Sequence, residues 1–129
     1  MIYGSKFFKC VNCDTLVEAL NPQCCDDLVC CGRPMRMLKI NADAALEEKH
    51  MPVIKRENDC ITVCVGRVLH PMCSEHSILW VELKGKYICY RVNLKKGDDP
   101  IVTFREIGSE RSYIVYAYCS IHGLWCAEI

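Results

Sequence analysis

The sequence of 129 residues has no excess charge of either sign, no long apolar run and no apolar segment at its N-terminus. Sixteen Lys and Arg balance sixteen Asp and Glu, so the chain lacks the basic field that holds nucleic acid or an anionic membrane. Its longest apolar stretches, such as residues 113–119, are far shorter than the roughly 20 residues that cross a bilayer. We therefore expect a cytoplasmic protein that binds neither nucleic acid nor a membrane.

Cysteine, in contrast, is abundant, with twelve residues in the chain. In a secreted protein this density would indicate a disulfide framework, but no export signal accompanies it. Six of the cysteines lie within residues 1–37, where the apolar pieces are too short to fold the segment by burial alone. Metal ligation is therefore the leading explanation, and we expect a small metal-binding domain at residues 1–37.

The rest of the chain has the pattern of strands with one buried face. Residues 37–50 are polar and form the expected connection, with at most one short helical turn. Apolar residues then alternate with other residues, as in Ile61, Val63 and Val65. Turn residues separate these runs and predict seven strands, near residues 52–56, 60–68, 77–84, 86–94, 101–106, 111–118 and 123–128. The predicted fold class is all-β, with an immunoglobulin-like antiparallel β-sandwich over residues 38–129.

The first cysteine cluster has the composition of a tetrahedral metal site. Cys10 and Cys13 form a C-x2-C pair, and Cys30 and Cys31 follow after sixteen residues. Four thiolates hold zinc or iron, because soft sulfur ligands suit these cations. Adjacent cysteines point their side chains apart, but Gly32 follows them and permits a tight turn.

Three alternatives remain open for this segment. Cys24 and Cys25 form another adjacent pair that competes for the same metal. The ion is zinc or iron, and its role is either redox or purely structural. Disulfides are the least favoured alternative, because they belong to oxidising compartments.

A second cluster combines all four histidines with one cysteine. His50, His70, His76 and His122 lie at predicted strand ends or turns, and Cys119 precedes His122 in a C-x2-H pair. Four imidazoles and a thiolate exceed a closed tetrahedral zinc site and leave one position of an octahedron vacant. Nitrogen ligands with a single thiolate suit ferrous iron, and the vacant position indicates reactivity.

Two charged residues precede the first of these histidines. Lys49 could place a positive charge beside the open coordination position and attract a small anion. Glu48 comes immediately before it. Taken alone, residues 47–49 are more typical of a solvated charge run.

These motifs resemble a known family, desulfoferrodoxin, the two-domain form of superoxide reductase. The resemblance covers essentially the whole chain, and its blocks follow the family's order. They are F-K-C-V-N-C at 8–13, L-V-C-C-G-R-P-M at 28–35, E-K-H-M-P-V-I at 48–54, H-P-M at 70–72, E-H-S-I-L-W-V-E-L at 75–83 and Y-C-S-I-H-G-L-W at 118–125.

The resemblance implies two iron ions per chain and a reaction. The desulforedoxin-like N-terminal domain would bind the first iron, which the reaction does not require, through Cys10, Cys13, Cys30 and Cys31. In the catalytic domain, His50, His70, His76 and His122 would surround a ferrous iron with Cys119 on its axis. The family reduces superoxide to hydrogen peroxide without releasing dioxygen. It is usually homodimeric and takes electrons from rubredoxin.

The resemblance also gives roles to the two charged residues. Lys49 would draw in superoxide, and Glu48 would ligate the oxidised iron. Asp14 departs from the family, since many relatives have glycine there, and we expect a slightly strained turn at this position. Seven further cysteines match no family ligand: Cys24, Cys25, Cys60, Cys64, Cys73, Cys89 and Cys126.

Two rival functions are weighed against superoxide reduction. The first is a non-catalytic electron-transfer protein in which both irons are coordinatively saturated. The second is a blue-copper-like sandwich that uses two histidines, Cys119 and a methionine. Rapid bleaching by superoxide with formation of peroxide would exclude the first rival, and a metal analysis that finds iron would exclude the second.

Overall fold

The computed structural model describes residues 4–20, 27–106 and 110–129. It divides the chain into two compact units, Met1–Lys39 and Ile40–Ile129. In the described ranges, none of the helical segments has the length and apolar character needed to span a membrane. The alternative ligand pair Cys24 and Cys25 lies outside the described residues, as do residues 107–109 between the predicted strands at 101–106 and 111–118.

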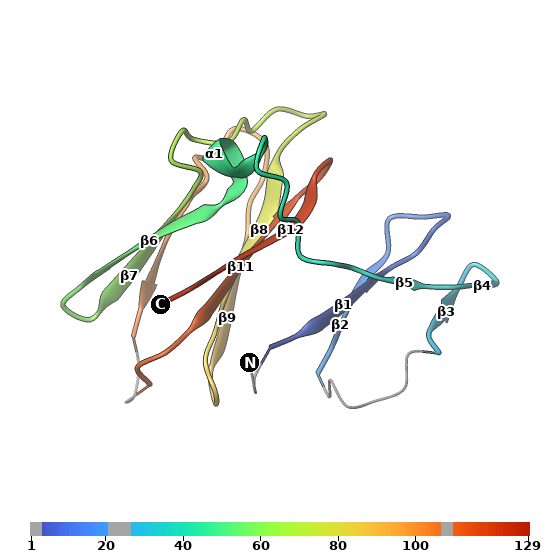
Figure 1. Ribbon diagram of the computed structural model, residues 1–129, viewed down its shortest axis with the longest axis horizontal. Helices are drawn as coiled ribbons and strands as arrows, with labels where there is room; N and C mark the ends of the chain where they lie inside the picture. Colours follow the sequence, from blue (N-terminus) through green and yellow to red (C-terminus); the bar gives the residue numbers. More distant parts are fainter. Residues whose placement is uncertain (1–3, 21–26, 107–109) are drawn as a thin grey trace. The chain divides into compact units, whose positions relative to one another are not determined.

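The first unit is a small β-structure around a metal-ligand cluster. Its three-stranded sheet has the order β2-β1-β5, from β1 (Lys6–Lys9), β2 (Leu16–Ala19) and β5 (Arg36–Met37). A separate hairpin pairs β3 (Val29–Cys30) with β4 (Arg33–Pro34) (Figure 1). Among its described residues, Phe8, Cys10 and Met35 form a small buried cluster with a few partly buried residues around it, so this unit has little apolar core to hold it together.

The second unit is an antiparallel sandwich of seven strands, as predicted. One sheet has the order β10-β7-β6 and the other the order β12-β11-β8-β9 (Figure 1). The strands are β6 (Pro52–Glu57), β7 (Cys60–Val65), β8 (Ile78–Lys84), β9 (Cys89–Asn93), β10 (Ile101–Arg105), β11 (Ile114–Cys119) and β12 (Gly123–Glu128). The short helix α1 (Glu47–His50) precedes β6, within the segment expected to connect the domains.

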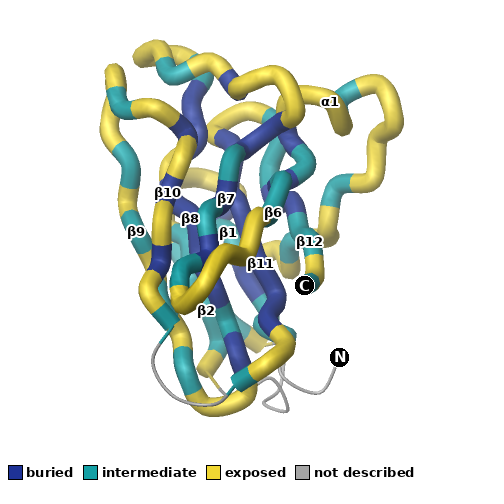
Figure 2. Tube along the Cα trace, turned by 90° about the vertical axis from the view of Figure 1, so that its left-hand side faces the viewer, coloured by how far each residue is buried: buried dark blue, intermediate teal, exposed yellow. Residues whose placement is uncertain are grey.

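The two sheets meet in one apolar core. Along β7 the predicted alternation is confirmed, because Ile61, Val63 and Val65 are fully buried and the residues between them are partly exposed. Figure 2 shows buried positions gathered on β7, β8 and β11, the inner strands of their sheets. This packed core gives the loops at the ends of the sandwich a fixed support.

One detail of the predicted alternation is wrong. Leu79, Val81 and Leu83 share one parity in the sequence, so a period of two predicts that they share a face. Leu79 is nevertheless 40% exposed, whereas Val81 and Leu83 are fully buried. The register explains the difference, because Tyr118 pairs with Trp80 and the next residue, Cys119, pairs with Ile78. The shift is a β-bulge in which Leu79 is the additional residue of β8, so its side chain no longer lies on the buried face with those of Val81 and Leu83.

Candidate metal centres

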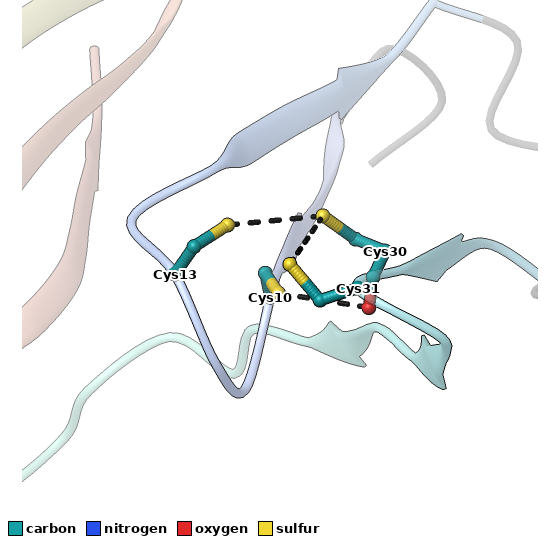
Figure 3. Close-up of side chains that lie close together, drawn as sticks. All are labelled: Cys10, Cys13, Cys30 and Cys31. Atoms are coloured by element: carbon teal, nitrogen blue, oxygen red, sulfur yellow. Dashed lines mark hydrogen bonds between the residues drawn. The ribbon is translucent and has the colours of Figure 1, made fainter.

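The four predicted cysteines of the first unit lie together, with Cys10 buried and Cys13 and Cys31 exposed. Cys10 follows β1, Cys13 lies in the next turn, and Cys30 and Cys31 lie where β3 turns into β4 (Figure 3). Their sulfur atoms all lie within 4.8 Å of one another. The Sγ atoms of Cys13 and Cys30 are 3.8 Å apart, and those of Cys30 and Cys31 are 4.0 Å apart.

The backbone explains how two adjacent cysteines join one cluster. Cys31 has a φ of 53° and Gly32 has a φ of 73°, so the chain turns through two successive left-handed residues. This turn brings both sulfurs to the same side, where an extended backbone would have separated them. The strain expected at Asp14 is not found, because the described non-glycine residues with positive φ are Cys31 and Asn58.

The thiols of this cluster differ in acidity. Hydrogen bonding to Thr15, whose Oγ1 is 3.1 Å from the Cys13 sulfur, lowers the pKa of Cys13 to about 6. Interaction first with Cys13 and then with Cys10 raises the pKa of Cys31 to about 12. One anionic sulfur therefore opposes ionisation of the others, and a cation is needed for all four to be thiolates together. The donor set fits iron or zinc.

The second cluster brings all four histidines to Cys119. His50 ends α1, His70 follows β7, His76 precedes β8, and His122 lies in the turn after β11. The Nε2 atoms of His50 and His70 are 3.1 Å apart, and Nε2 of His50 is 3.1 Å from Nδ1 of His122. The sulfur of Cys119, at the end of β11, lies 3.3 Å from Nε2 of His70 and 3.2 Å from Nε2 of His76.

These spacings suit ligands of a single ion. Nitrogen atoms that bind a metal at about 2.1 Å and at right angles to each other are about 3 Å apart. Without a metal ion, ring nitrogens whose lone pairs face each other at this distance, with no proton between them, would be buried without a hydrogen-bond partner, which is unfavourable. Four imidazole nitrogens and one sulfur make a donor set that fits iron, as the sequence predicts.

Hydrogen bonds to the backbone set which nitrogen faces the cluster. Nδ1 of His50 is 2.8 Å from the carbonyl oxygen of Leu46, and Nδ1 of His70 is 2.7 Å from that of Pro71. A carbonyl oxygen only accepts, so each Nδ1 carries the proton and each Nε2 keeps its lone pair. Trp125 adds a packing contact by stacking on the His50 ring, with centroids 4.9 Å apart.

Burial shifts these groups toward their uncharged forms. It lowers the pKa of His50 and His76 and lowers that of His70 to about 4. It also raises the pKa of the Cys119 thiol, against the effect of the His122 N–H group, which donates to the sulfur at 3.3 Å. The imidazoles are thus ready to bind a cation, and the buried thiolate requires one.

Glu48 and Lys49 lie at the edge of this cluster. Both are exposed on α1, directly before the buried His50. Besides burial and the other imidazoles, the charge of Lys49 lowers the pKa of His50 and His76. Its ammonium group therefore acts electrostatically on the cluster while remaining in solvent.

Comparisons with known proteins agree with this geometry. A family model described as Desulfoferrodoxin matches residues 42–128. The chain belongs to the desulfoferrodoxin family. It is 44% identical to the desulfoferrodoxin of Syntrophotalea carbinolica and 39% identical to that of Nitratidesulfovibrio vulgaris, over 94% and 95% of both chains respectively. The crystal structure of the superoxide reductase from Treponema pallidum matches with a TM-score of 0.83 at 27% identity, covering 97% of this chain and 98% of that one.

Some supporting residues of the desulfoferrodoxin site were not predicted. The carbonyl groups of Leu46 and Pro71 carry no side-chain signal, so only the folded backbone identifies them. Trp125 lies in the last matching block, and its alternation along β12 could have placed it inside the sandwich. The further cysteines that the structure describes form no disulfide and lie outside both clusters: Cys60, Cys64, Cys73, Cys89 and Cys126.

The buried imidazoles predict a pH-dependent stability of the metal-free protein. His70 has a native pKa of about 4 against 6.5 for the unfolded chain, so the unfolded state binds more protons between these values. Stability should therefore fall as the pH drops from 7 to 5, by roughly 2 kcal/mol from His70 alone. Thermal melting of chelator-treated protein at both pH values measures this loss.

The control for this experiment is the chelator-treated His70→Gln variant. It should lose less stability than the parent over the same pH range, because it has no imidazole to protonate at that position. Equal melting temperatures of the parent protein at pH 7 and pH 5 would contradict the expected contribution.

Proposed function

We propose that this chain is a superoxide reductase, which reduces superoxide by one electron to hydrogen peroxide and releases no dioxygen. The observation that carries the proposal is the convergence of four imidazoles on the Cys119 sulfur at the end of the sandwich. Membership of the desulfoferrodoxin family and the likeness to the Treponema pallidum superoxide reductase support it.

The proposed ligands of the catalytic iron are His50, His70, His76, His122 and Cys119. When bound, this ion supplies the electron that superoxide takes up. The protein's part is to favour the neutral forms of His50, His70 and His76 by burial and to keep the thiolate away from solvent. The second proposed iron is held by Cys10, Cys13, Cys30 and Cys31, and the two assigned domains are residues 1–37 and 38–129.

Lys49 and Glu48 are the proposed catalytic side chains. Lys49 attracts superoxide, since it is exposed and its charge already acts on the imidazoles of His50 and His76. Glu48 is its neighbour on α1, and we assign it the role of carboxylate ligand to the oxidised ion. Solvent supplies the two protons that hydrogen peroxide requires.

The remaining assignments concern the setting of the reaction. We propose a rubredoxin-like electron donor, a homodimer and a cytoplasmic location. The free thiols of all ten described cysteines support a reducing compartment. The exposure of Cys13 and Cys31 supports electron exchange with another protein at the first centre.

Substitution of the thiolate ligand tests the catalytic centre. Cys119→Ser replaces a soft anionic donor with a neutral hydroxyl, so the thiolate-to-iron absorption should disappear and activity should fall by more than about tenfold. The spectrum of the first centre should remain. Visible spectroscopy with a superoxide-consumption assay measures both.

Cys126→Ser provides the matched control, because Cys126 is a half-buried cysteine of β12 that belongs to neither cluster. It should keep both absorption bands and full activity. A Cys119→Ser protein that also kept both bands would remove Cys119 from the ligand set.

Removal of the positive charge tests how superoxide is attracted. Lys49→Ala should slow the reaction about threefold to tenfold at low ionic strength and make the rate less dependent on salt. Lys55→Ala removes an equally exposed lysine from β6 and should have little effect. Pulse radiolysis over a range of salt concentrations gives the rates, and equal rates for Lys49→Ala and the parent would exclude Lys49 from the encounter.

Whether turnover requires the first centre can be tested separately. Cys13→Ser should weaken the first centre, because it removes a thiol whose pKa is lowered by hydrogen bonding to Thr15 and which is therefore readily ionised for metal binding. Turnover should be preserved when iron analysis confirms a loaded second centre. Loss of turnover despite that loading would show that the first centre takes part in the reaction.

A further inference from the structure

The chain between β7 and His70 forms a tight turn against α1. Residues 66–69 make this turn, which is closed by the N–H group of His70 donating to the carbonyl oxygen of Val65 at 3.0 Å. The turn thus delivers one histidine of the catalytic cluster. Its other side faces the segment that carries Glu48 and Lys49.

Two backbone hydrogen bonds join the turn to that segment. The N–H group of Val68 donates to the carbonyl oxygen of Glu48, and the N–H group of Gly66 donates to that of Met51, each at 3.2 Å. They bracket Lys49 on both sides. Because main-chain groups make both bonds, the position of the segment depends on how closely the two backbones approach.

Gly66 is the point of closest approach. A Cβ atom at this position would lie 2.6 Å from the carbonyl oxygen of Lys49 and 2.7 Å from its carbonyl carbon, and it would also meet the carbonyl oxygen of Val68. These neighbours are backbone atoms, which cannot turn aside as a flexible side chain can. Gly66 also has a φ of 91°, a conformation that favours glycine.

We propose that Gly66 is a positioning residue for superoxide reduction, which sets the place of Lys49 at the edge of the catalytic cluster. Any side chain at position 66 pushes the Lys49 carbonyl away and lengthens the two flanking hydrogen bonds. The ammonium group then no longer stands where it attracts the anion. This inference rests on the proposed role of Lys49.

The chain contains a matched control for the backbone strain. Gly97 has the same φ of 91°, but a Cβ there would meet nothing within 4 Å. Gly97→Ala therefore introduces the strain of an L-residue at positive φ without a collision. Gly66→Asn introduces the collision with less backbone strain, because asparagine tolerates positive φ better than alanine does but still has a Cβ atom.

The experiment compares Gly66→Ala, Gly66→Asn and Gly97→Ala in the iron-loaded full chain. Hydrogen–deuterium exchange of the peptide spanning residues 46–52 reports the segment's position without relying on activity. Exchange should be faster in both Gly66 variants and unchanged in Gly97→Ala. Both Gly66 variants should also react about threefold more slowly with superoxide at low salt, with a flatter salt dependence and the absorption of the catalytic centre retained.

A double substitution tests whether Gly66 affects the reaction rate through Lys49 or by another route. In a Lys49→Ala background, Gly66→Ala should change the rate little, because the charge that it displaces is already gone. The proposal would be overturned if the rate losses of the two substitutions multiplied in the double variant. It would also be overturned if Gly66→Asn matched the parent in rate and exchange, or if a Gly66 variant lost the catalytic iron. If Gly66→Ala does not fold, Gly66→Asn gives the same test with less backbone strain.

The two hypotheses fail in different ways. An unchanged rate in Lys49→Ala would refute the proposed role of Lys49 in attracting superoxide, and with it the rate effect expected of Gly66. Unchanged exchange of residues 46–52 in both Gly66 variants would refute the positioning role of Gly66, whatever Lys49 does.

Discussion

A buried thiol surrounded by imidazoles is the constraint on which the rest of this molecule depends. Cys119 is fully buried, and three histidine nitrogens lie within 3.9 Å of its sulfur. Burial raises the pKa of the thiol and lowers that of His70 and His76, so an ionised thiolate lacks a positive partner in these two rings. Iron supplies that charge, and metal binding becomes part of the stability of the fold as well as of its chemistry.

In the sandwich, a rigid strand positions the thiol, whereas a short helix and turns position the histidines. Cys119 ends β11, an inner strand, so its position is fixed by pairing on both sides. The histidines come from α1 and from three turns, where the backbone can adopt the conformations that the site needs. Carbonyl groups of Leu46 and Pro71 then orient two of the rings. The strands therefore define the centre, and the loops complete it.

Sequence patterns predicted the fold and both clusters well because the signals are local or chemical. Alternation in β7 depends only on which face is buried, and C-x2-C or C-x2-H spacings depend only on chain reach. The bulge that exposes Leu79 could not be predicted, because it arises from pairing with a distant strand. The left-handed backbone was expected at Asp14 but lies at Cys31, where two adjacent sulfurs must turn to one side. Which nitrogen of each ring faces the metal likewise depends on tertiary contacts.

The stacking of Trp125 on His50 gives the catalytic centre an optical reporter of its own. The chain has two tryptophans, and this one is fully buried with its ring in contact with a proposed ligand ring. An open-shell ion held by that histidine would quench the indole emission at short range, whereas the other indole, Trp80, stacks on Tyr118. Fluorescence intensity therefore offers a way to follow iron entering or leaving this site during purification and storage.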